Sequence, residues 1–83
     1  MENKVLVKLY LPELEIDFDI YLPISKRIGN IINLVIKAIN EMGYYYNADI
    51  TKALYSRNTG EKYEINSLLY NTNIRNGSEL ILL

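Results

Sequence analysis

The spacing of apolar residues changes after residue 22 of this chain of 83 residues, and that change constrains the fold more than any other feature. Up to residue 22, apolar side chains recur at every second position, which is the period of a strand with one buried face. Between residues 28 and 42 they recur every three or four positions, which is the period of an amphipathic helix. The sequence therefore predicts strands that are followed by one helix.

The two strands are predicted at residues 4–11 and 15–22, with three residues between them. Pro12 favours a turn there, so the two strands form an antiparallel hairpin. Pro23 ends the second strand because proline has no N–H group to donate to a ladder. The apolar face of the hairpin consists of Val5, Val7, Leu9, Leu11, Ile16, Phe18, Ile20 and Leu22.

The helix is predicted to be about fifteen residues long and to pack through an isoleucine-rich stripe. Ser25 is a candidate N-cap and Gly43 stands where a left-handed C-cap is expected. Three asparagines and Gly29 weaken the helix by itself, so its packing on the sheet must stabilise it. The stripe consists of Ile28, Ile31, Ile32, Val35, Ile39 and Met42.

The rest of the chain predicts three short strands, at residues 51–56, 62–65 and 78–83. The turn 57–60 joins the first two, and Asn76-Gly77 makes the tight turn into the last one. The order is β-β-α-β-β-β, and the strongly apolar first and last strands are expected side by side in the middle. We predict one domain over residues 1–83, an α+β fold with a mixed sheet of four to five strands and one helix across one face. This is the β-grasp arrangement.

The composition argues against catalysis and against several ligand classes. The formal net charge is −1, from nine basic and ten acidic residues, and no basic stripe favours nucleic acid. There is no cysteine and no histidine, so thiolate chemistry, disulfides and the commonest general base are absent. The serines have no histidine to activate them. We therefore expect no enzyme activity, no cofactor and no metal.

An acidic row in the second predicted strand is the one feature that resembles a metal site. Glu15, Asp17 and Asp19 alternate along the strand, so neighbouring carboxylates lie about 7 Å apart and do not converge on one ion. A solvated strand face whose charge protects an edge is the better interpretation.

The N-terminus does not resemble a signal peptide, and residues 28–38 are too few and too polar to span a bilayer. We expect a cytoplasmic protein without direct membrane insertion.

The C-terminal third carries a resemblance to ubiquitin in the spacing of Leu69, Asn73, Ile74, Leu80 and Leu82. Residues 69–83 read L-x(4)-I-x-x-G-x-x-L-x-L-L, and the second strand ends in Tyr21-Leu22-Pro23-Ile24 before the isoleucine-rich helix. With these features the chain resembles most closely the YukD-like ubiquitin-fold family, small bacterial proteins associated with type VII (WXG100) secretion systems.

The resemblance implies a non-catalytic, protein-binding adaptor, a cytoplasmic accessory or regulatory component of a Gram-positive type VII apparatus. Its implied partners are the membrane-bound secretion machinery, including the ATPase complex. Ubiquitin and the sulfur carriers act through a flexible tail that ends in Gly-Gly, whereas this sequence ends in Leu80-Ile81-Leu82-Leu83. Conjugation is therefore not expected. The alternatives are a β-grasp interaction domain of another pathway or, less favoured, a sulfur carrier or modifier.

Two surfaces are candidates for partner binding. The first is the sheet face away from the helix, where alternation places the side chains that do not point into the core. A homodimer through that face would cover it equally well. The second is the aromatic cluster Tyr44–Tyr46 after the helix, since tyrosine is favoured at interfaces, although one or two rings could instead close the end of the core. The predicted binding residues are Leu6, Tyr10, Leu54, Tyr55, Ile81 and Leu83 on the sheet, with Tyr44 and Tyr45.

Overall fold

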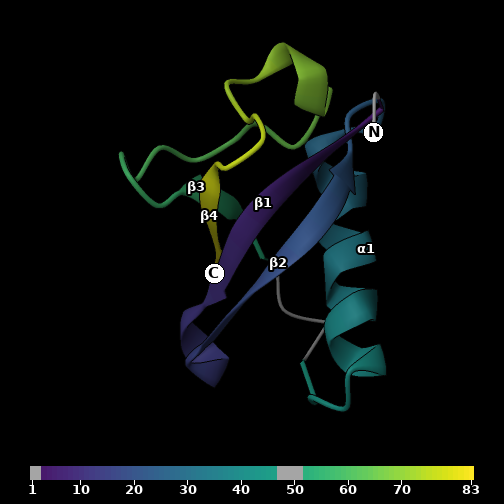
Figure 1. Cartoon of the computed structure of the whole chain (residues 1–83), viewed down its shortest axis with the longest axis vertical. Helices are drawn as coiled ribbons and strands as arrows, with labels where there is room; N and C mark the ends of the chain where they lie inside the picture. The colour runs from purple at the N-terminus through teal and green to yellow at the C-terminus, as the bar shows by residue number, and fades with distance from the viewer. Residues whose placement is uncertain (1–2, 47–51) are drawn as a thin grey trace.

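The computed structural model describes residues 3–46 and 52–83, and it contains one sheet and one long helix (Figure 1). The helix α1 lies behind the sheet and crosses one of its faces, as predicted. The elements in chain order are β1 (Lys4–Leu11), a 3-10 helix (Pro12–Leu14), β2 (Ile16–Pro23), α1 (Ile28–Glu41), β3 (Leu54–Ser56), a second 3-10 helix (Leu69–Asn71) and β4 (Glu79–Leu82).

The sheet has four strands in the order β2-β1-β4-β3. The strand β1 pairs antiparallel with β2 along its whole length, and parallel with β4. The strand β3 pairs antiparallel with β4. The prediction that the first and last strands are central neighbours is therefore confirmed, and β2 and β3 form the two edges.

The predicted hairpin is confirmed, with β2 beginning one residue later than expected. Residues 12–14 form a 3-10 turn in which the Glu15 N–H donates to the carbonyl of Pro12 at 3.2 Å. Glu15 itself has a φ of 54°, which lies in the left-handed region and removes it from the strand.

The core lies between the inner face of the sheet and α1. The inward side chains of β1, Val7, Leu9 and Leu11, are at most 1% exposed. The predicted isoleucine stripe of α1 faces them, except Met42, which is 52% exposed beyond the end of the helix. The other buried apolar residues are Leu22, Ile36, Tyr46, Ala53, Leu54, Tyr63, Leu69, Ile74, Leu80 and Leu82.

The prediction that Ser25 caps the helix is wrong. The helix begins at Ile28, and no side chain caps it. Instead, the N–H groups of Ile28 and Gly29 each donate, at 2.9 Å, to main-chain carbonyls of Ser67 and Ile65. A distant loop therefore satisfies the helix N-terminus, which local sequence cannot reveal. At the other end Gly43 has a φ of 97°, as the C-cap prediction requires.

The fifth strand, predicted at residues 62–65, is reduced to a single bridge between Tyr55 and Lys62. Two main-chain hydrogen bonds flank it, from the Ser56 N–H to Glu61 at 2.8 Å and from the Tyr63 N–H to Leu54 at 2.9 Å. Beyond Tyr63 the chain leaves β3, and the carbonyl of Ile65 accepts a hydrogen bond from the Gly29 N–H. The start predicted for β3, at residue 51, lies outside the described residues.

Candidate protein-binding face

The sheet has an outer face that α1 does not cover. On β1 the inward residues are buried, so by alternation Leu6, Lys8 and Tyr10 point to the outer face. The register places Tyr21 of β2 beside Leu6, and Ile81 of β4 beside Tyr10. The outer face therefore has an apolar pair at each end, with charged residues between them.

The end of the face around Tyr10 is already covered. Ile81 lies between Tyr10 and Tyr55 in the register, and these three side chains form one row across three strands. The guanidinium carbon of Arg57 lies 4.7 Å from the centre of the Tyr10 ring, and an Arg57 nitrogen lies 3.9 Å from a carboxylate oxygen of Glu79. Such cation–π stacking covers one face of the Tyr10 ring.

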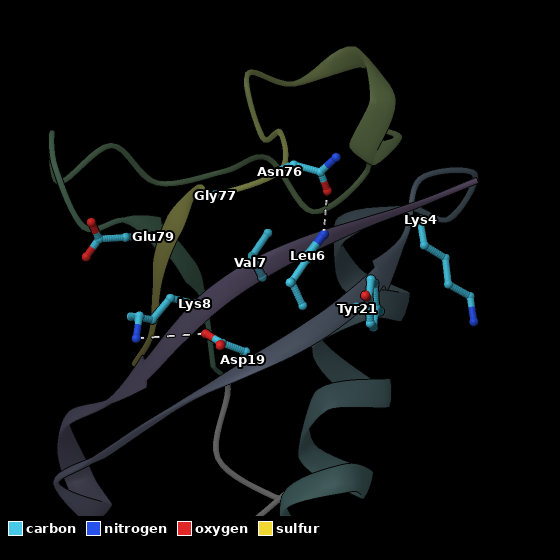
Figure 2. A pocket seen from close by; sticks show the side chains of 9 residues that line it. All are labelled: Lys4, Leu6, Val7, Lys8, Asp19, Tyr21, Asn76, Gly77 and Glu79. Carbon is cyan, nitrogen blue, oxygen red and sulfur yellow. Dashed lines mark hydrogen bonds and ion pairs between the residues drawn. The ribbon is translucent and has the colours of Figure 1, made fainter. Parts of the chain in front are cut away.

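The end around Leu6 is open and hollowed. A depression of about 490 Å³ lies there, and its rim includes the exposed ring of Tyr21, which is 54% exposed (Figure 2). Leu6 is 36% exposed in its floor. The residues that line this depression are Lys4, Leu6, Val7, Lys8, Asp19, Tyr21, Asn76, Gly77 and Glu79.

The turn before β4 fixes the backbone of this depression. The Leu6 N–H donates to the Oδ1 atom of Asn76 at 2.8 Å, and the Gly77 N–H donates to the Leu6 carbonyl at 2.8 Å. Gly77 has a φ of 88°, which glycine adopts without strain. The predicted Asn76-Gly77 turn thus positions Leu6 as well as the last strand.

The charges around the depression are mixed in sign. Lys8 pairs with Asp19 at 3.8 Å across β1 and β2, with both side chains about half exposed (Figure 2). Lys4 and Glu79 add one charge of each sign to the rim. A surface pair of this kind contributes little to stability, so these groups are available to select a partner.

The structure corrects one predicted site residue. Leu54 is 1% exposed and belongs to the core, so its placement on the outer face is wrong. In the strand β3, Leu54 and Ser56 point inward and Tyr55 points outward. Three residues are too few for the sequence pattern to predict which of them face the core. Leu83 is 52% exposed, and its backbone exchanges two hydrogen bonds with Ala53.

Tyr21 was missed as a site residue, although its signal was present. It is the last outward residue in the alternation of the second strand, and it follows two acidic residues on the same face. Its register partner is Leu6, which was predicted. Reading the two strands of the hairpin together would have identified the pair.

The tyrosine cluster divides between surface and core. Tyr45 is 89% exposed and Tyr44 is 40% exposed, and both follow α1, away from the outer face. Tyr46 is 3% exposed and closes the end of the core, as one of the two interpretations of the cluster expected. Its N–H donates to Oδ1 of Asn40 at 2.8 Å.

A buried lysine lies against Tyr46. The Lys52 side chain is 2% exposed; its ammonium group pairs with the carboxylate of Glu13 and lies 4.6 Å from the centre of the Tyr46 ring. The hydrogen bond to Glu13 raises the pKa of Lys52 above its ordinary value, although burial opposes the rise. Burial raises the pKa of Tyr46. This cluster connects the hairpin turn to the chain before β3.

Within residues 3–46 and 52–83, no group of three or more acidic, histidine or cysteine side chains is arranged to hold a metal ion. No helix in the same ranges combines the length and apolar character that a membrane span requires.

No protein-family model matches this sequence, and no curated protein matches it. Solved structures do match. The ubiquitin-like domain of the Mycobacterium tuberculosis type VII secretion protein EccD1 is similar with a TM-score of 0.75 at 16% identity, over 96% of this chain and 97% of that one. A chain of the MycP5-free ESX-5 inner membrane complex is similar with a TM-score of 0.71 at 15% identity. That match covers 98% of this chain but only 21% of the larger one.

A chain of toluene 4-monooxygenase in complex with 4-bromobenzoate is similar with a TM-score of 0.78 at 4% identity, over 95% of both chains. Since the same fold occurs in secretion and monooxygenase assemblies, it does not by itself fix function. Together with other ubiquitin-like domains that match, these similarities show that the chain has the ubiquitin-like β-grasp fold.

Proposed function

We propose that this protein is a non-catalytic adaptor that docks onto a component of a type VII secretion apparatus through the Leu6 end of its outer sheet face. The observation that carries the proposal is the open depression around Leu6 and Tyr21. An exposed apolar pair in a hollow with mixed charges at its rim is the anatomy of a small protein interface.

The link to secretion is supported by the resemblance of the sequence to YukD-like proteins and by the structural similarity to EccD1 and to a chain of the ESX-5 inner membrane complex. The partner that we propose is therefore the membrane-bound secretion machinery, including its ATPase complex. We place the docking residues at Leu6 and Tyr21. The other predicted residues of the sheet lie at the margin of this docking site, since Arg57 already covers Tyr10. They are Tyr10, Tyr55, Ile81 and Leu83.

The test is copurification of secretion-complex subunits with the tagged protein from its own cells, under gentle conditions. Leu6→Asp is expected to lower their recovery at least tenfold, because it places a charge in the floor of the depression. Leu34→Asp is the matched control, since Leu34 is 48% exposed on α1, on the opposite side of the sheet. Urea unfolding of both variants checks that they remain folded.

Equal recovery with both variants would show that the partner docks elsewhere. A parallel purification under denaturing conditions tests the modifier alternative, because a covalent adduct would survive it. Recovery of a stable complex that contains no secretion subunit would instead favour a β-grasp domain of another pathway.

A further inference from the structure

The edge of the sheet formed by β2 is open along its length. The strand has eight residues and, within the described part of the chain, pairs only with β1. Among residues 3–46 and 52–83, no main-chain hydrogen bond reaches its other side. In Figure 1 it forms the border of the sheet, with no further strand beyond it.

The backbone groups on this free edge can be identified from the pattern on β1. The main-chain groups of Leu6 and Lys8 point toward β4, since they bond to residues 76–78. Successive residues of a strand alternate, so the odd-numbered residues of β1 bond to β2. Through the register, their partners are the even-numbered residues of β2.

The N–H and C=O groups of Asp17, Asp19 and Tyr21 therefore point outward at the free edge. Pro23, which has no N–H, limits the edge at one end, and Glu15, with its left-handed backbone, limits it at the other. The free edge can thus hold a partner strand of about five residues.

The apolar side chains under this edge are incompletely covered. Ile16, Phe18 and Ile20 are only partly buried, whereas their register partners on β1 are at most 1% exposed. Burial thus decreases from one strand to the next. An added strand would place its own inward side chains about 5 Å from these residues and extend the core.

The outer side of the same edge is acidic. Asp17 and Asp19 are exposed, and Asp19 has Lys8 as a half-exposed partner at 3.8 Å. In the described part of the chain Asp17 has no ion pair. A second copy of β2 would bring like charges face to face, which disfavours self-pairing. A basic strand would satisfy them.

We propose that the free edge of β2 is a second binding site, which adds an extended partner segment of alternating basic and apolar residues as a fifth strand. Main-chain hydrogen bonds to Asp17, Asp19 and Tyr21 supply the pairing. The basic side chains face the two carboxylates, and the apolar ones cover Phe18 and Ile20. The site shares Asp19 and Tyr21 with the outer-face depression, but its pairing uses their main-chain groups, whereas the docking proposed above uses the side chains of Leu6 and Tyr21.

The test uses an acetylated and amidated hexapeptide of alternating lysine and valine, with binding followed by NMR on the labelled full chain. Saturation is expected to slow hydrogen exchange of the Asp17, Asp19 and Tyr21 amides at least tenfold. A peptide with glutamate in place of lysine is expected to bind at least tenfold more weakly. N-methylation of the lysine peptide at the amides that face the edge keeps its charge and is expected to abolish binding.

Two matched double variants locate the charge effect. Asp17→Lys with Asp19→Lys is expected to weaken binding at least tenfold, whereas Glu61→Lys with Glu64→Lys, the same change of charge elsewhere, is expected to change it less than twofold. Leu6→Ser is expected to leave binding within twofold.

Unchanged binding of the N-methylated peptide would overturn the proposal, because attraction of charges alone would then explain it. So would loss of binding in the Leu6→Ser variant, which would place the peptide on the outer face. No detectable binding of the lysine peptide would leave the acidic row with its protective role only and would also overturn the proposal.

Discussion

The two edges of the sheet are handled in opposite ways. The edge strand β3 has only three residues, and the chain returns along it after the turn at residues 57–60, with hydrogen bonds to Glu61 and from Tyr63. The edge strand β2 has eight residues and no such cover within the described residues. The closed edge uses main-chain hydrogen bonds and a buried tyrosine, whereas the open edge carries exposed carboxylates.

The two edges show two ways to prevent unwanted association at an unpaired strand. An unpaired strand edge is a template for association with another chain, so a protein must cover it or make it unattractive. Covering an edge uses residues that then become part of the core, and their loss destabilises the fold. Protecting an edge with charge leaves stability almost unaffected and leaves the edge able to accept a complementary partner.

The largest expected effect is at the closed edge. Tyr63 is 7% exposed, and its hydroxyl donates to Oδ1 of Asn73 at 2.8 Å. Tyr63→Ala is expected to lower the free energy of unfolding by about 3 kcal/mol, through a cavity and a lost hydrogen bond. Tyr21→Ala at the open edge is the matched control, with an expected change of about 0.5 kcal/mol or less. Urea denaturation measures both, and equal losses would remove the contrast between the edges.

A smaller loss is expected at the buried lysine. Glu13→Ala leaves the Lys52 ammonium buried without its carboxylate, but Glu13 is about half exposed, so solvent moderates the effect. We expect a loss of about 1–2 kcal/mol in the free energy of unfolding. The control is Asp19→Ala, which breaks the exposed Lys8 pair at the open edge and should cost at most about 0.5 kcal/mol. A larger loss for Asp19→Ala than for Glu13→Ala would contradict this ranking.

A third loss of stability is expected only in alkali, where buried tyrosine and lysine side chains lose their protons. Burial raises the pKa of Tyr63 and of Tyr46, and the pairing with Glu13 raises that of Lys52. The folded state therefore holds these protons more tightly than the unfolded state. Their contribution to stability is complete below the ordinary pKa values of about 10 and is lost as the pH rises through the higher folded values. Urea midpoints between pH 8 and pH 11 should fall, and Tyr63→Phe should reduce the fall.

The smallest effect on stability is expected at the acidic row, where the change is in association. Asp17→Thr with Asp19→Thr removes the protective charge and adds residues favoured in strands, so the variant is expected to self-associate while its unfolding free energy changes by about 0.5 kcal/mol. Sedimentation velocity over a concentration series measures this. Glu61→Thr with Glu64→Thr should sediment like the original protein, and self-association of both variants would remove the special role of β2.

Most of the fold could be predicted because period and turn chemistry are local. The bounds of β1, the hairpin, the position of α1 and the left-handed Gly43 all follow from residues that are near one another in sequence. The errors occur where distant segments decide. Ser25 does not cap α1 because a loop some forty residues later supplies carbonyls to its N-terminus. Residues 62–65 do not form a strand because the chain leaves β3 after Tyr63, and Ile65 bonds to the N-terminus of α1 instead.

The candidate site was predicted less completely for the same reason. Leu6, Tyr10, Tyr55 and Ile81 follow from alternation, but alternation does not say that Arg57 covers Tyr10, or that Tyr21 lies beside Leu6. The error at Leu54 arose because a three-residue strand leaves its phase undetermined.

The sequence alone determined the first hairpin and the helix, which side chains of β1 face the core, and which classes of chemistry the residues can support. These properties depend on local backbone preferences and on the identity of the residues. Only the tertiary structure decided which edge of the sheet is closed, where the outer face is open, and which buried charge meets its partner. Those properties depend on contacts between segments far apart in the chain, and pairing and burial are set by that packing.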